Sequence, residues 1–270
     1  MGKKKRSAHN PEVEFTRSAI KCLANARRLI KQADILHYDP KNTSTGYALA
    51  ILAQEETVKA FLLFLVSCEG LPWNPQVCRS LRDHVCKQLW FVVLEALVAD
   101  INAHRLQNGL PAPEVFDASG CLLDKVADVL NWYRYAKIAT WDRGYCDWDE
   151  EPADNQVRGI VSGKLDRRKQ NALYVGISNS GKVTSSPDSF TVVDAEQAIK
   201  VAEAYHAYVS DLIGILGGYG LHQVEWLKGL LKAIFTPPVR TGREIHDRIP
   251  GVVFYEESRI VLQSRKPVGA

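Results

Sequence analysis

The sequence predicts a mainly α-helical bundle with a minor β element, and three observations support this fold class. Several long stretches carry apolar residues at helical spacing without an internal Gly or Pro. One of them, residues 47–68, is apolar on every side, which is typical of a helix buried on several faces. Strand-like segments bounded by turn residues are short and few. With 270 residues, the chain can bury one good core.

Capping and breaking residues place the helix boundaries. An Asn-Pro pair offers a capping side chain followed by Pro at the first helical position, and it starts the first helix and again the third. Thr43 or Ser44 is expected to cap the second helix, and Gly70 to end it. The predicted helices cover about residues 11–38, 44–70, 75–108, 122–139, 194–216 and 221–235.

The β element and the loops fall between these helices and near the C-terminus. Residues 172–177 and 182–184 predict two strands joined by a Ser/Asn/Gly turn. Residues 252–255 and 260–262 predict a second small hairpin. Residues 142–159 are acidic, aromatic and irregular, which indicates a long functional or mobile loop.

Composition and charge exclude several classes of protein. The chain is 46% hydrophobic and 24% charged, as in an ordinary globular protein, and its net charge of +3 does not by itself predict nucleic-acid binding. The basic runs at 3–6 and 164–169 are interpreted as a solvated tail and a loop face. The cysteines form no CxxC pair, which favours a reducing cytoplasm without disulfides. There is no secretory signal, and the longest charge-free apolar run, residues 60–68, is too short to cross a bilayer.

Three charges interrupt the apolar second helix. Glu55 and Lys59 lie four apart on one face, in the order that favours an ion pair, and Glu56 lies beside them. A buried carboxylate needs a partner, because an unpaired one costs several kcal/mol or takes up a proton. These charges therefore either enter a polar site or form a charged stripe that reaches water at the edge of the bundle.

Two motifs resemble functional sites but fit them poorly. Residues 176–182, GISNSGK, approach a phosphate-binding loop, yet Val183 replaces the hydroxyl residue that would hold Mg²⁺, and Pro187 stands where the helix should begin. We interpret this segment as a hairpin turn. Glu203 and His206 form a single Glu-x-x-His, whereas a di-iron bundle needs two copies. No metal site and no cofactor is predicted.

Arg79 and His84 form the remaining candidate site. Histidine exchanges protons near neutral pH and can activate a ribose 2′-hydroxyl, and arginine can hold the phosphate and stabilise its developing charge. Such a pair suits metal-free RNA cleavage. Arg240 and His246 show a similar spacing, so the spacing alone is not specific. An alternative without catalysis is that Arg79, Asp83 and Lys87 form a ladder of charges at i,i+4 spacing, as many exposed helices do.

The surroundings of this pair add weight to it, because the chain resembles the AbiV family of phage abortive-infection proteins. The resemblance is collinear from about Asn25 to Ala198. It consists of short motifs: Asn25-Ala26, Leu29, Ala33-Asp34, Ala48-Leu49-Ala50, Glu55-Glu56-x-x-Lys59, Asp83-His84-x-x-Lys87, residues 169–175 (KQNALYV) and Pro187.

The resemblance implies a HEPN-like helical domain, a class in which many members are ribonucleases that use Arg-x4–6-His at a dimer interface. Other members bind nucleotides or partners without cutting RNA. Arg79 and His84 would be the catalytic pair. The residues implied to support them in one groove are Glu55, Glu56, Lys59, Arg82, Asp83 and Lys87. The family usually shows Gly just before the lysine, where this chain has Val58.

These observations lead to one functional expectation and one alternative. The first is a cytoplasmic antiphage abortive-infection effector, a metal-independent ribonuclease that acts as a homodimer. Its expected partners are RNA, a second copy of the chain and a phage-encoded activator protein, without a membrane. The alternative is a non-catalytic helical module that binds a phage protein or a nucleotide through the same groove. The expected divisions are a basic tail (1–10), the helical domain (11–217, with a hairpin insertion at 170–186) and a C-terminal helix and extension (218–270).

Overall fold

The computed structural model describes residues 11–107, 129–130, 132–133, 137, 154–214, 252–255 and 259–262. It is mainly helical, as predicted. The elements in chain order are α1 (Pro11–His37), α2 (Thr43–Ser67), α3 (Pro75–Ser80), α4 (His84–Gln107), α7 (Asn155–Val161), α8 (Lys164–Asn171), β1 (Gly176–Ile177), β2 (Val183–Ser185), the 3₁₀ turn η2 (Pro187–Ser189), α9 (Val192–Gly214), β3 (Val252–Tyr255) and β4 (Arg259–Leu262).

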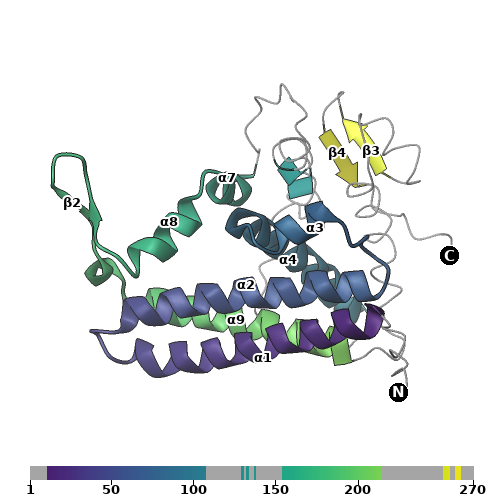
Figure 1. Cartoon of the computed structure of the whole chain (residues 1–270), viewed down its shortest axis with the longest axis horizontal. Helices are drawn as coiled ribbons and strands as arrows, with labels where there is room; N and C mark the ends of the chain where they lie inside the picture. Colours follow the sequence, from purple (N-terminus) through teal and green to yellow (C-terminus); the bar gives the residue numbers. More distant parts are fainter. Residues whose placement is uncertain are drawn as a thin grey trace, which may run out of the picture.

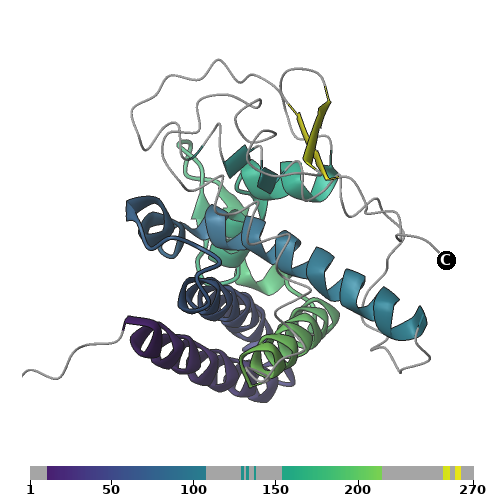
Figure 2. The same cartoon turned by 90° about the vertical axis from the view of Figure 1, so that its right-hand side faces the viewer.

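The long helices α1, α2 and α9 lie side by side and form the base of the molecule (Figure 1). Helix α4 packs across α2 on the side away from α1 (Figure 2), while α8 also contacts α2 and α7 contacts α4. Helix α2 therefore has neighbours on most sides. This arrangement explains its apolar sequence, and nearly all of its side chains from Ala48 to Val66 are buried or half-buried.

The start of α2 differs from the prediction that Thr43 or Ser44 caps it. The helix begins at Thr43, and the preceding Asn42 makes no side-chain capping bond. The Thr43 hydroxyl lies 3.2 Å from the carbonyl oxygens of His37 and Asp39, so it ties α2 to the end of α1. The predicted cap was wrong because the Thr43 hydroxyl bonds to carbonyl groups of the turn between α1 and α2 and not to an amide of α2.

The end of α2 lies close to the predicted position. The helix ends at Ser67, and the amides of Glu69 and Gly70 bond back to the carbonyls of Val66 and Leu65. Glu69 adopts φ 56°, the left-handed conformation that usually falls to glycine. The left-handed residue that terminates the helix is therefore Glu69 and not the predicted Gly70.

The third predicted helix is in fact two helices. Helix α3 ends at Ser80, and α4 begins at His84. The amides of Arg82 and Asp83 bond to the carbonyl of Arg79, and an Asp83 oxygen accepts the Cys86 amide at 2.9 Å, as an N-cap does. The prediction of one continuous helix was wrong because the apolar pattern runs on through a position where a side chain can start a new helix.

The segment after residue 154 holds two short helices that the sequence pattern did not reveal. Asp154 caps α7 by accepting the amides of Gln156 and Val157, so residues 155–159 are helical rather than irregular. Helix α8 follows after Gly163, which has φ 71°. The basic run at 164–169 therefore lies on a helix and not on a loop.

The two predicted hairpins are present. Strands β1 and β2 pair antiparallel, and β1 is shorter than predicted because Ala172 caps the end of α8. Strands β3 and β4 pair antiparallel with Val252 opposite Leu262. The fifth predicted helix is α9. The predicted helix at 221–235, most of the one at 122–139, and residues 142–153 of the predicted loop lie outside the described residues.

The core lies where α2, α4 and α9 meet. Trp90 of α4 is buried and stands edge-on to the Tyr133 ring, with their centroids 5.3 Å apart. The Tyr133 hydroxyl donates to the Cys86 carbonyl at 3.0 Å, and burial raises the pKa of the Cys86 thiol to about 12. Within the described residues, no helix combines the length and the apolar character needed to cross a membrane.

The closest approach of α1 and α2 depends on Gly46. A Cβ at this position would lie 3.1 Å from the Ala33 carbonyl oxygen and 3.2 Å from the His37 amide nitrogen, both backbone atoms. We predict that Gly46→Val lowers the free energy of unfolding by about 1–3 kcal/mol, because the two helices must separate. Urea unfolding measures the change.

Gly159 provides the matched control, since a Cβ built there meets nothing within 4 Å. Gly159→Val should leave stability nearly unchanged. An equal loss in both variants would show that helix propensity, and not the α1–α2 approach, explains the effect.

Candidate functional site

The buried carboxylate of Glu55 is the centre of the candidate site. It lies in the middle of α2, where α4 and α8 both pack, and the residue is only 3% exposed. Its neighbours are side chains of α4 and α8. The group formed by Glu55, His84, Lys87, Asp166 and Lys169 is called the Glu55 cluster below.

Each oxygen of Glu55 has a lysine partner. Lys87 Nζ lies 2.7 Å from Oε2, and Lys169 Nζ lies 2.9 Å from Oε1. Lys169 Nζ also lies 2.8 Å from Asp166 Oδ1. Both lysines are almost fully buried. Two carboxylates and two ammonium groups therefore balance in charge inside the protein, which is the condition under which buried charges are tolerated.

The two lysines decide the ionisation of Glu55. Burial alone would raise the pKa of Glu55, but the charges and hydrogen bonds of Lys87 and Lys169 outweigh it and hold that pKa below its ordinary value. Burial would likewise lower the pKa of Lys169, but Asp166 and Glu55 raise it. Both groups are therefore charged at neutral pH.

His84 connects this buried network to the solvent. It is the first residue of α4, its Nδ1 lies 2.7 Å from Glu55 Oε2, and its side chain is 48% exposed. Lys169 Nζ and Lys87 Nζ lie 3.1 and 3.4 Å from the same Nδ1. An ionised Glu55 can only accept, so its bond to His84 requires the tautomer with a proton on Nδ1, in which Nε2 is the ring atom left to exchange a proton. A carboxylate that fixes the tautomer of an accessible imidazole is an arrangement suited to general-base chemistry.

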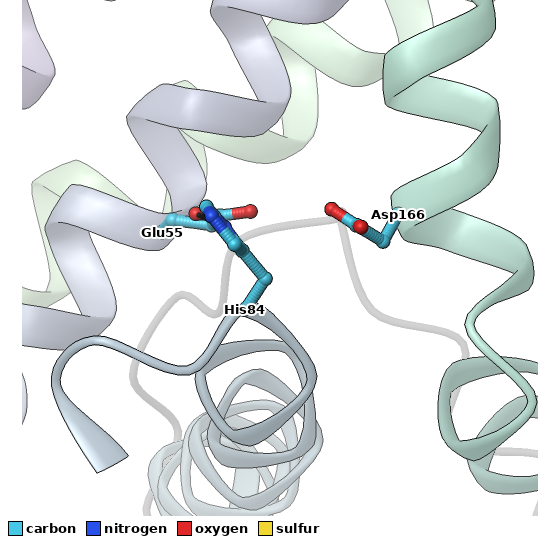
Figure 3. A group of neighbouring side chains, drawn as sticks. All are labelled: Glu55, His84 and Asp166. Atoms are coloured by element: carbon cyan, nitrogen blue, oxygen red, sulfur yellow. Dashed lines mark hydrogen bonds and ion pairs between the residues drawn. The ribbon is translucent and has the colours of Figure 1, made fainter. Parts of the chain in front are cut away.

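Glu55, His84 and Asp166 have the residue types of a metal site, with one ligand atom from each lying within 4.8 Å of the others. Figure 3 shows Glu55 and His84 in contact, with Asp166 facing them from α8. A divalent cation would have to displace Lys169 from both carboxylates and lie close to Lys87. The donor set therefore fits the two ammonium groups better than a metal ion.

Asp83 lies beside the Glu55 cluster and holds the start of α4 in place. It caps α4 through the Cys86 amide, and its other oxygen accepts from Lys137 Nζ at 2.9 Å. Burial would raise the pKa of Asp83, but these bonds hold it below its ordinary value. Asp83 thus fixes the first turn of α4, the turn that carries His84.

The two arginines of the predicted motif region lie outside α4, the helix that carries His84. Arg79 belongs to α3 and Arg82 to the turn between α3 and α4, and both are exposed. Within the described part of the chain, no hydrogen bond or ion pair joins either side chain to Glu55 or His84. The sequence-based expectation that Arg79 and His84 share one helix was therefore wrong, because the α3–α4 break separates them.

Glu56 and Lys59 of α2 pair with each other and do not join the Glu55 cluster. Their charges act on Cys22 of α1, whose pKa is raised chiefly by burial and further by Glu56. The structure does not bring them to Glu55, and Lys59 pairs with Glu56 instead of Glu55. Of the eight residues predicted for the site, Glu55, His84 and Lys87 meet directly.

Sequence reasoning missed Asp166 and Lys169 as site residues. The basic run that contains Lys169 was interpreted as solvated, yet this lysine is buried at the centre of the cluster. Two signals pointed to it: Lys169 begins the KQNALYV motif, and Asp166 lies three residues before it, on the same face of a helix.

The two poorly fitting motifs have structural roles. Residues 178–181 form the β1–β2 turn, with Gly181 at φ 77°. His206 Nε2 lies 3.1 Å from the Leu23 carbonyl oxygen, and burial lowers the pKa of His206.

Glu55→Gln should weaken the protein in a pH-dependent way. Because the folded-state pKa of Glu55 lies below its ordinary value of 4.5, its stabilising effect is present above about pH 4.5 and is lost as pH falls through the folded-state pKa. We predict a loss of about 3–5 kcal/mol at pH 7 that becomes smaller at pH 3.5, measured by urea unfolding. Glu56→Gln, which lies outside the Glu55 cluster, is the control. A loss from Glu55→Gln that is equal at both pH values would contradict the ionised cluster.

One of three comparisons with known proteins identifies a family for this chain. A family model described as HEPN_AbiV, AbiV, matches residues 14–207. This range contains every member of the Glu55 cluster and the helices that position it. No curated protein and no solved structure matches the chain. Because the match covers well over half of the sequence, the chain belongs to the AbiV family and carries its HEPN-type abortive-infection domain.

Proposed function

We propose that this protein is an antiphage abortive-infection effector that cleaves RNA in the cytoplasm without a metal ion. One observation supports the proposal above the others: the half-exposed imidazole of His84 is held through Nδ1 by a buried and ionised carboxylate. Membership of the AbiV family supplies the biological setting. The proposed substrate is a single strand that can bring a ribose to the exposed edge of His84.

The proposed reaction begins at His84 Nε2. This nitrogen takes the proton of a ribose 2′-hydroxyl, and Glu55 stabilises the imidazolium that forms. The 2′-oxygen then attacks the adjacent phosphorus, the bond to the 5′-oxygen breaks, and a 2′,3′-cyclic phosphate results. In a two-fold dimer, the second copy of the motif returns a proton to the leaving 5′-oxygen.

The basic residues have different roles in this proposal. Lys87 and Lys169 are bound to Glu55, so they position the carboxylate and do not reach out to the substrate. The exposed guanidinium of Arg79 holds the phosphate and stabilises its charge in the transition state. Arg82 adds positive charge on the same turn.

His84→Ala should reduce RNA cleavage by about 10²–10⁴-fold, because it removes the general base. The assay incubates purified protein with RNA, with and without a chelator, and cleavage by the wild type should survive the chelator. His206→Ala is the matched control, since it removes a part-buried histidine that bonds to α1. Cleavage by His84→Ala at the wild-type rate would show that the assignment of the base is wrong.

The proposed dimer is a separate prediction. Sedimentation at micromolar concentration should show a dimer, because two copies of the motif have to face each other for proton return. A mixture of His84→Ala and Arg79→Ala subunits should recover part of the activity if each site draws on both chains. A strict monomer that still cleaves RNA would rule out the two-fold arrangement.

The second candidate function is a non-catalytic module that binds a phage protein or a nucleotide through the same groove. The observation that favours it is the closed network of Glu55, Lys87 and Lys169, which stabilises the fold without any substrate. Cells that express His84→Ala decide between the two functions. Protection against phage that persists in this variant, without RNA cleavage by the wild type, would support the module.

A further inference from the structure

A cavity of about 340 Å³ lies beside the Glu55 cluster. This volume falls within the range of about 300–1,000 Å³ that small-molecule sites occupy. Four helices form the walls: α2, α4, α7 and α8. Glu55 and Lys87 belong both to the wall and to the cluster, so only one side chain separates His84 from the cavity. The apolar part of the wall consists of Ile51, Val58, Phe91, Ile160 and Leu165.

Gln88 is the unusual residue of this wall. It is 4% exposed, and neither its amide nitrogen nor its amide oxygen has a hydrogen-bond partner among the described residues. Gln54, in the same wall, donates its amide to the Ala198 carbonyl at 3.1 Å. A buried amide without partners is destabilising, so its presence next to a cavity needs an explanation beyond packing. A ligand that supplies both a donor and an acceptor provides one.

The cavity also offers a positive charge at its edge. Lys164 lines it, is exposed, and has no ion-pair partner within the described part of the chain. Arg168 lines it too, but its guanidinium is bound to Asp194. The site is therefore largely apolar, with a buried amide of Gln88 that has no partner among the described residues and with the exposed ammonium group of Lys164 at the rim. A nucleotide matches this pattern, because it joins a flat base to an anionic phosphate.

We propose that this cavity binds the adenine base of a nucleotide, with Gln88 bonding to the base edge and Lys164 contacting a phosphate. A glutamine amide pairs with the N6 donor and N7 acceptor of adenine, whereas guanine presents two acceptors on the same edge. If the base belongs to an RNA strand, the inference rests on the proposed RNA cleavage. The cavity would then select the base of the nucleotide beside His84. A free adenine nucleotide has the same chemistry, and the experiment separates these two sources.

Direct binding tests the inference without depending on cleavage. Titration calorimetry with 5′-AMP and 5′-GMP is carried out on wild type, Gln88→Met and the control Gln32→Met, which changes an exposed glutamine of α1. Wild type and the control should bind 5′-AMP at least about tenfold more tightly than 5′-GMP, and Gln88→Met should lose this preference. Gln88→Met should unfold at the same or a higher urea concentration, because it removes an unpaired amide. Equal affinities for the two nucleotides in wild type, or an unchanged preference in Gln88→Met, would overturn the proposal.

A second variant fills the cavity instead of changing its polarity. Gly159 lines the cavity, and a Cβ built there meets nothing within 4 Å, so Gly159→Leu should fold normally. It should weaken 5′-AMP binding by at least about tenfold. Unchanged binding in a folded Gly159→Leu protein would show that 5′-AMP binds elsewhere.

The source of the base is found by competition. An oligodeoxyadenylate, which lacks the 2′-hydroxyl and resists cleavage, should displace 5′-AMP if the cavity takes bases from a strand. Displacement by free nucleotides alone would assign the cavity to a free adenine nucleotide. If the wild type binds 5′-AMP but does not cleave RNA, the proposed function is refuted and the adenine site stands. If the wild type cleaves RNA but does not bind 5′-AMP, the adenine site is refuted and the proposed function stands.

Discussion

The ionised carboxylate of Glu55 is the constraint on which the arrangement of this protein depends. Once α2 is buried on most sides, a negative charge in its middle is tolerated only if cations are brought to it. Lys87 comes from α4, and Lys169 comes from α8, 114 residues after Glu55 in the chain. The need to satisfy one side chain therefore fixes the positions of two other helices around α2. His84 is held at the edge of this network by the same carboxylate.

Much of the fold follows from local sequence signals. Helices α1, α2 and α9 are long and strongly patterned, so their existence and approximate ends could be predicted. The break between α3 and α4 could not, because the apolar periodicity continues across it and only the capping by Asp83 reveals it. Helix α8 was missed for another reason. Its sequence is mostly charged, and its one fully buried charge, Lys169, is satisfied by a partner distant in sequence.

The candidate site was predictable in part. The sequence could point to Glu55, His84 and Lys87 because all three belong to the short motifs that resemble the AbiV family. Their partners could not be assigned from spacing alone. Glu55 and Lys59 have the right separation for an ion pair on an isolated helix, but Lys59 bonds to Glu56. Tertiary contacts offered Glu55 better-placed ammonium groups than its own helix did.

The turn at residues 81–83 places the two halves of the proposed Arg–His motif on two separate helices. In one continuous helix, the separation of Arg79 and His84 would be set by helix geometry alone. Here His84 is anchored to Glu55 from α4, while Arg79 is carried by the six-residue α3, which the turn joins to it. Val77 anchors α3 in the core through its buried side chain. The distance between the guanidinium and the imidazole is therefore set by the turn and by the packing of α3, and not by the repeat of a single helix.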